Sequence, residues 1–233
     1  MGYAALFSGG KDSVFAVFKA IRNGIDVDCL VTMIPENRDS YMFHSPALSV
    51  TPLQSETMGI RHFIAFCSGE KEAEVDELQN AIETVGASGI ITGAITSSYQ
   101  MNRIEHLCRK LHLDLFAPLW RTDEESLLRE FLCEGFEAIF VSVAADGLDM
   151  SWLGRRLDEE SLSDLMNIRK MRGINLSGEG GEYETLVLDG PIFGKRIALG
   201  RYETEWKGGA GRISLDCGDV RLVAKRINRV KTP

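Results

Sequence analysis

The stretch "ALFSGGKDSVFAVFKA", residues 5–20, decides the fold, because it joins an apolar strand to a helix through a tight glycine loop. Gly9 and Gly10 can adopt backbone angles that other residues avoid, and they let the main chain approach a ligand closely. The apolar side chains that follow recur at helical spacing, and Asn23-Gly24 ends the helix. A helix N-terminus placed after such a loop directs N–H groups and the positive end of its dipole at one point, where an anion fits. The stretch therefore predicts a phosphate site, with further donors from Ser8, Lys11 and Ser13.

Spacing excludes two familiar nucleotide-binding loops. A Walker A loop has a glycine separated by four residues from Gly-Lys-Ser/Thr, but the residue at that place is Ala5, and Lys11 is followed by Asp12. A dinucleotide fingerprint needs G-x-G-x-x-G, which Gly9-Gly10 does not supply. The remaining pattern, S-G-G-K-D-S directly after a strand, resembles the PP-loop of the N-type ATP pyrophosphatases. The alternative is a plain strand-to-helix turn made of small residues.

Composition sets the class of protein. The chain has 233 residues, 44% of them hydrophobic, and a net charge of −8, which disfavours broad binding to nucleic acid. We expect no signal peptide after Met1, and no apolar run approaches the ~20 residues that span a bilayer. The five cysteines include no C-x-x-C pair, so we expect reduced thiols in a cytoplasmic protein and no structural zinc site. The oligomeric state stays open, a homo-oligomer included.

Strand and helix patterns alternate over the first 145 or so residues. Apolar runs predict five strands, at residues 3–7, 27–34, 61–66, 88–95 and 137–144, with amphipathic helices between them. This alternation favours an α/β fold, a doubly wound parallel sheet of the HUP-like PP-loop type. Because ligands of such sheets lie at the carboxyl ends of the strands, we expect a nucleotide base near Met33, Ile34, Gly93 and Ala94.

The pattern changes near Asp146-Gly147. One more helix ends near Arg172-Gly173, and mostly strand signals follow. We therefore expect residues 1–146 to form the ATP-binding domain, and residues 147–233 a smaller mixed α+β domain that binds substrate and closes over the first.

A second motif, "GEGGEYETLVLDGP", spans residues 178–191. Its glutamates Glu179, Glu182 and Glu184 lie so close that their charges repel, which a bound cation would relieve. That cation could be a metal, an ammonium group or a substrate amine. The alternative is a solvated entry to a hairpin.

The two motifs flank a third stretch, "GAITSSYQMNRIEHLCRKLHLDLFAPLW" at residues 93–120. Together, in this order, they resemble the diphthine–ammonia ligases, and the resemblance covers most of residues 1–200. It implies ATP-dependent amidation of diphthine on translation elongation factor 2 with ammonia, by way of an acyl-adenylate, with release of AMP and pyrophosphate. It also implies that the chain is the short form, without the C-terminal domains of longer relatives.

The resemblance assigns roles to individual residues. Ser8, Gly9, Gly10, Lys11 and Ser13 would cradle the β- and γ-phosphates, while Asp12 would cap the helix or help to hold Mg²⁺. The expected catalytic residues are Lys11, Asp12, Arg103, Glu182 and Glu184. The expected substrate-binding residues are Tyr99, Gln100, Glu179, Gly180, Tyr183 and Thr185, with His44 and Glu56 as weaker candidates.

Two other functions stay open on the residues alone. A PP-loop enzyme that thiolates tRNA would usually carry paired cysteines and a basic surface, and this chain has neither. A regulator that binds ATP without turnover would not need the glutamate-rich motif.

Overall fold

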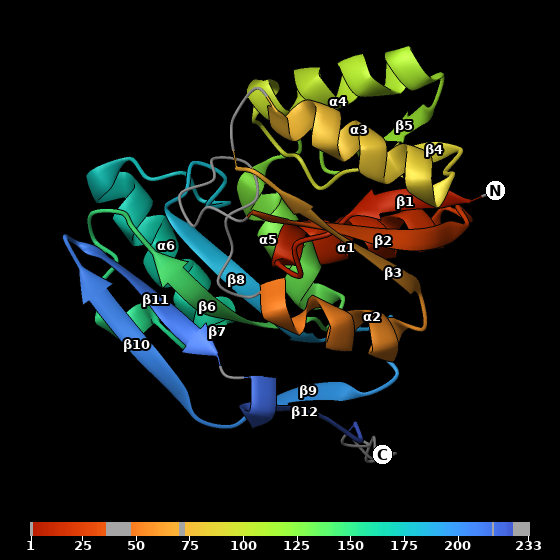
Figure 1. Ribbon diagram of the computed structural model, residues 1–233. Coiled ribbons are helices and arrows are strands. Elements are labelled where there is room, and N and C mark those ends of the chain that lie inside the picture. The colour runs from red at the N-terminus through yellow and green to blue at the C-terminus, as the bar shows by residue number, and fades with distance from the viewer. Residues whose placement is uncertain (1, 36–47, 70–72, 216, 226–233) are drawn as a thin grey trace, which may run out of the picture.

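A five-stranded parallel sheet forms the N-terminal part of the molecule. The computed structural model describes residues 2–35, 48–69, 73–215 and 217–225 (Figure 1). The sheet has the order β3-β2-β1-β4-β5, and every neighbouring pair is parallel. Its strands are β1 (Tyr3–Leu6), β2 (Val27–Pro35), β3 (Arg61–Cys67), β4 (Gly89–Ile91) and β5 (Asp114–Phe116). The order reverses beside β1, so the sheet is doubly wound, as predicted.

Helices cover both faces of this sheet. The helices α3 (Ala73–Val85) and α4 (Ser98–Leu111) pack against one face, through a core that includes Leu78, Ile82 and Leu107. The helices α1 (Lys11–Arg22), α2 (Thr51–Met58) and α5 (Glu124–Cys133) lie on the opposite side of the sheet (Figure 1). The expected end of α1 at Asn23-Gly24 is confirmed, since Asn23 is its C-cap.

A cluster of phenylalanine rings fastens α1 to α5. Phe15 and Phe18 of α1 meet Phe131 of α5 and Phe136 just after it, with ring centroids 4.8–5.8 Å apart. Both stacked and edge-on pairs occur, as aromatic quadrupoles prefer. The cluster fixes the axis of α1, and with it the direction in which its N-terminus points.

The C-terminal part is built on antiparallel strands. One sheet has the order β10-β11-β6-β7, and β8 also pairs with β6. A separate two-stranded sheet joins β9 to β12. The strands are β6 (Glu137–Val143), β7 (Arg156–Leu157), β8 (Tyr183–Asp189), β9 (Arg196–Leu199), β10 (Tyr202–Lys207), β11 (Ala210–Leu215) and β12 (Val220–Val223). The helix α6 (Glu159–Arg172) starts with a capping box between Asp158 and Ser161 and ends at Gly173.

One predicted strand belongs elsewhere. We expected residues 137–144 to extend the parallel sheet, and this is wrong, because β6 pairs antiparallel with β7, β8 and β11. The strand is buried along most of its length, so its apolar run looks the same in either kind of sheet. The expected division of the chain after residue 146 stays a prediction. The short strand β5 was not predicted.

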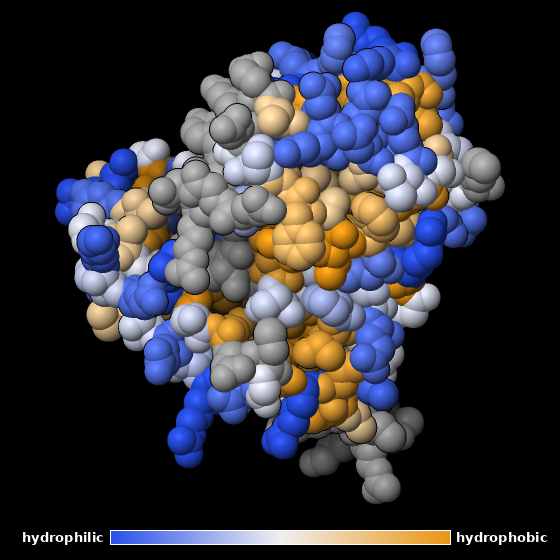
Figure 2. All heavy atoms as spheres, in the orientation of Figure 1, coloured by the Kyte–Doolittle hydropathy of each residue, from blue (hydrophilic) through white to orange (hydrophobic). Residues whose placement is uncertain are grey.

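The side of the molecule that faces the viewer in Figures 1 and 2 carries both hydrophilic and hydrophobic residues. Figure 2 shows apolar side chains gathered near its middle, where β3 is the outermost strand of the parallel sheet. Phe66 and Ile64 of β3 are among the exposed large hydrophobic residues. Over the part of the chain that the structure describes, no helix is both long and apolar enough to cross a membrane.

The phenylalanine cluster gives a stability prediction. Phe131→Ala removes a ring that is 2% exposed, whereas Phe66→Ala removes one that is 69% exposed. We expect Phe131→Ala to lower the free energy of unfolding by about 3–5 kcal/mol and Phe66→Ala by less than about 0.5 kcal/mol. Urea denaturation followed by circular dichroism measures both. Equal losses would show that the cluster does not fasten α1.

Candidate active site

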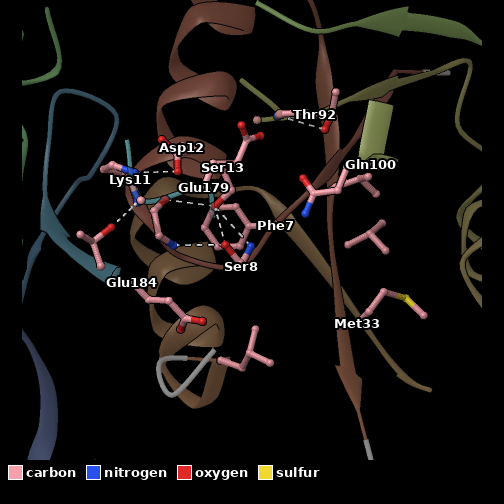
Figure 3. Close-up of a pocket in the computed structure, with 18 of the residues that line it drawn as sticks. Phe7, Ser8, Lys11, Asp12, Ser13, Met33, Thr92, Gln100, Glu179 and Glu184 are labelled. Carbon is pink, nitrogen blue, oxygen red and sulfur yellow. Dashed lines mark hydrogen bonds and ion pairs between the residues drawn. The ribbon is translucent and has the colours of Figure 1, made fainter. Parts of the chain in front are cut away.

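A cavity of about 260 Å³ opens at the point where the strand order reverses (Figure 3). The connections that follow β1 and β4 lead to helices on opposite faces of the sheet, and this is where other doubly wound sheets bind their ligands. The cavity gathers most of the predicted residues. Its lining includes Ser8, Gly10, Lys11, Asp12, Ser13, Met33, Gly93, Ala94, Gln100, Glu179, Tyr183, Glu184 and Thr185.

The phosphate loop leaves donors at the start of α1. Gly10 is the N-cap of the helix and supplies no side-chain cap, so the first-turn N–H groups of Asp12 and Ser13 point toward the loop. The hydroxyl oxygens of Ser8 and Ser13 lie 3.3 Å apart beside them. This convergence of N–H and O–H donors at a helix N-terminus suits an oxyanion.

The loop is held in place by β8 and α2. The Val187 N–H donates to the Gly9 carbonyl at 3.1 Å, and the Lys11 N–H donates to Thr185 Oγ1 at 3.0 Å. The Gln54 side chain, fully buried, donates from Nε2 to the carbonyls of Gly9 and Val187, both at 2.8 Å. Sequence reasoning missed Gln54, because nothing local marks a helical glutamine as the support of a distant loop.

Lys11 is turned inward rather than toward solvent. Its side chain is buried, and Nζ donates to Asp12 Oδ2 at 2.8 Å and to the Ser177 carbonyl at 2.5 Å. The ammonium also lies 5.2 Å from the centre of the Tyr183 ring. Lys11 therefore supplies a fixed positive charge at the cavity, and its ammonium lies against the ring of Tyr183, which we expected to bind substrate.

Tyr183 and Asp12 carry perturbed pKa values. Burial raises the pKa of Tyr183 well above its ordinary value, with nearby carboxylates adding to the effect. The Tyr183 hydroxyl therefore stays neutral and donates to the Leu176 carbonyl at 2.7 Å. Burial also raises the pKa of Asp12, against the opposing influence of Lys11. Asp12 makes no helix-capping bond, because Gly10 is the N-cap, so the predicted cap role is not observed.

The three glutamates of the second motif have different surroundings. Glu184 lines the cavity, whereas Glu182 does not, and Glu182 Oε1 instead accepts from the Asn175 N–H at 3.0 Å. Glu179 lines the cavity and reaches across to the start of α4. Gly180 is exposed and lies outside the lining. The motif therefore places two of its three carboxylates at the cavity.

Of the predicted residues on α4, one lines the cavity and two do not. Gln100 lines the cavity, and its N–H donates to the N-cap residue Ser97 at 3.3 Å. Tyr99 and Arg103 stack on each other, with the guanidinium 4.0 Å from the ring centre, and share one helix face as predicted. Neither belongs to the cavity lining.

None of the remaining predicted residues that the structure describes lines the cavity, Gly9 included. Ile34 is not part of its lining, and Glu56 is exposed on α2. His44 lies outside the described residues. Gly93 lies so close to α1 that an added Cβ would come within 2.7 Å of the Asp12 carbonyl, which explains a glycine at this point.

The fold and the cavity define a doubly wound α/β protein whose switch point carries a glycine loop suited to an oxyanion. Residues 1–115 match the diphthamide synthase N-terminal domain, and residues 123–219 match the diphthamide synthase C-terminal domain. The chain belongs to the diphthamide synthase family.

Curated relatives carry one name. Those from human and rat, each named diphthine–ammonia ligase, are 35% and 34% identical over 222 residues, covering 85% of this chain and 83% of the relative. The zebrafish protein of the same name is 34% identical, with 88% of each chain covered. A solved structure from Methanocaldococcus jannaschii, described as a predicted subunit of tRNA methyltransferase, aligns with a TM-score of 0.45 at 17% identity over 82% of this chain and 98% of that one, which is too weak to argue from.

The geometry of Gly9 gives a matched test of the loop. Gly9 has φ +77° and Gly24 has φ +75°, but a Cβ on Gly9 would come within 2.2 Å of Gln54 Oε1, whereas one on Gly24 would meet nothing within 4 Å. Both alanine variants share the backbone strain of roughly 1–2 kcal/mol. We expect Gly9→Ala alone to weaken ATP binding by at least about tenfold, because the loop must shift. Calorimetric titration with ATP measures this, and equal affinities for the two variants would contradict the assignment.

Proposed function

We propose that this chain amidates diphthine on translation elongation factor 2 with ammonia, converting ATP to AMP and pyrophosphate. One observation carries the proposal: a single cavity joins the oxyanion-binding loop, residues 8–13, to the carboxylate of Glu184. The relatives named diphthine–ammonia ligase support the choice of acceptor. We also propose that the protein works in the cytoplasm, where its protein substrate is made.

In the first step, the diphthine carboxylate attacks the α-phosphorus of ATP. A new oxygen–phosphorus bond forms, and the bond to the bridging oxygen breaks, so that pyrophosphate leaves with the electron pair. The loop hydroxyls of Ser8 and Ser13 and the first-turn N–H groups of α1 would stabilise the charge that grows on pyrophosphate. The buried ammonium of Lys11 would add positive potential at the phosphates.

In the second step, ammonia attacks the activated acyl carbon. A carbon–nitrogen bond forms, AMP leaves with the electrons of the carbon–oxygen bond, and the nitrogen gives up a proton. Glu184 is the carboxylate of β8 that lines the cavity, so we assign it the role of the base that accepts this proton. The same carboxylate can attract the fixed trimethylammonium charge of diphthine.

The cavity also fits a nucleotide-bound Mg²⁺. Among the described residues, no group of three or more His, Cys, Asp or Glu could hold a metal ion. Mg²⁺ commonly binds through phosphate oxygens, water and one or two carboxylates, and Asp12 supplies one carboxylate in the lining. When bound, the ion would neutralise phosphate charge.

The direct test mixes the protein with ATP, ammonium and elongation factor 2 that carries diphthine. We expect AMP and pyrophosphate to appear together with a diphthamide mass shift on the factor. Turnover only with tRNA would replace this proposal with RNA modification. Tight ATP binding without products under any of these conditions would indicate a regulator.

The role of Glu184 gives a sharper prediction. Glu184→Gln keeps the size of the side chain but removes the charge, so we expect amide formation to fall by about a hundredfold or more. Affinity for ATP should stay within about threefold of the wild type, because the phosphate loop is held by other groups. Glu203→Gln, on the exposed strand β10, is the matched control and should behave as wild type. Normal amidation by Glu184→Gln would remove Glu184 from the mechanism.

A further inference from the structure

Glu179 makes a set of contacts that substrate binding does not require. Its Oε1 accepts from the Ile95 N–H at 2.8 Å, and its Oε2 accepts from the Ser97 N–H at 2.9 Å and from the Thr96 hydroxyl at 2.6 Å. Oε2 also accepts from the Thr96 N–H. Since Ser97 is the N-cap of α4, the carboxylate occupies the positive end of that helix. Charge-assisted bonds of this kind are the stronger ones in proteins.

These bonds join two walls of the cavity that are far apart in the chain. The donors follow β4, which carries the wall formed by Gly93 and Ala94. Glu179 lies in the turn that leads into β8, which carries Tyr183, Glu184 and Thr185. Figure 3 labels both Glu179 and Glu184 among the residues that line the cavity. The carboxylate therefore bridges the cavity from the second motif to the third stretch.

The turn that carries Glu179 is closed by a hydrogen bond and packs against the start of β8. Gly181 donates to the Gly178 carbonyl at 3.0 Å, and both glycines have positive φ. An added Cβ on Gly178 would lie 2.8 Å from the Tyr183 carbonyl, so the turn packs directly against the first residue of β8. Moving Glu179 would therefore displace Gly178 and Tyr183, which both line the cavity.

We propose that Glu179 is a positioning residue, which ties the 178–181 turn to the start of α4 and so shapes the acceptor side of the cavity. This inference rests on the proposed function and deepens it. Both carboxylate oxygens accept hydrogen bonds from the β4–α4 connection, so the charge of Glu179 is neutralised by donors of the protein itself. The expected role of Glu179 as a direct ligand of the diphthine cation passes to Glu184.

If Glu179 holds the 178–181 turn in place, its loss should affect use of the acceptor without affecting ATP binding. The phosphate loop is held by Val187, Thr185 and Gln54, none of which bonds to Glu179. Loss of the tie should therefore spare ATP binding and impair use of the acceptor. A residue that served only overall stability would impair both together.

The experiment compares Glu179→Gln with the control Glu203→Gln in three measurements. We expect Glu179→Gln to lower kcat/KM for diphthine-bearing elongation factor 2 by about ten- to a hundredfold, with the Kd for ATP within about threefold. Hydrogen exchange at the amides of residues 95–97 should speed up by at least about tenfold, because the variant keeps one neutral acceptor oxygen in place of two charged ones. Thr96→Val removes one donor of the four, so it should act in the same direction but more weakly. The double variant should fall no further than Glu179→Gln alone.

Each failure has a distinct meaning. Unchanged exchange at residues 95–97 in Glu179→Gln, or unchanged kcat/KM for the acceptor, would overturn the tie. Equal losses in ATP affinity and acceptor use would also overturn it. If the wild type forms no amide at all, the proposed function fails, while exchange and ATP affinity still test the tie by themselves.

Discussion

The hydrogen bonds between the phosphate loop and β8 are the contacts on which the rest of the site depends. Val187 donates to the Gly9 carbonyl, and Thr185 accepts from the Lys11 N–H. A loop with two adjacent glycines has a wide choice of backbone angles when it is left alone, so its donors converge only if something else fixes them. The strand that supplies this constraint belongs to the glutamate-rich motif. The two motifs are therefore one structural unit, although more than 170 residues separate Lys11 from Thr185.

The arrangement of charge follows from this unit. Lys11 is buried between Asp12, the Ser177 carbonyl and the Tyr183 ring, so it contributes a fixed field instead of a mobile arm. Glu179 is bound to the start of α4, and Glu184 faces the cavity. A positive cradle for the phosphates thus lies beside an acidic wall. That polarity suits a reaction in which an anionic leaving group departs on one side and a cationic acceptor is bound on the other.

Local chemistry made the first motif readable from the sequence. The strand, the loop and the helix all depend on near neighbours, and Gly9 does adopt the left-handed angle that its position suggested. The second motif was harder to interpret. The sequence suggested one cluster of Glu179, Glu182 and Glu184, but β8 begins only at Tyr183. Glu182 therefore precedes the strand, and its carboxylate accepts from the Asn175 N–H instead of lining the cavity.

Long-range contacts were beyond the reach of the sequence. Nothing near Gln54 signals that it supports Gly9, and nothing near Glu179 signals the three N–H groups at the start of α4. The strand β6 shows the same limit, because a mainly apolar run does not reveal which sheet the strand will join. In each case the missing information was the partner, not the residue type.

The most direct measurement is a crystal structure with an ATP analogue whose α,β bridge is a methylene group, which blocks the proposed cleavage. The account predicts that the β- and γ-phosphates lie within hydrogen-bonding distance of the Ser8 and Ser13 hydroxyls and of the first-turn N–H groups of α1. A triphosphate bound anywhere else, with residues 8–13 free of it, would contradict the account.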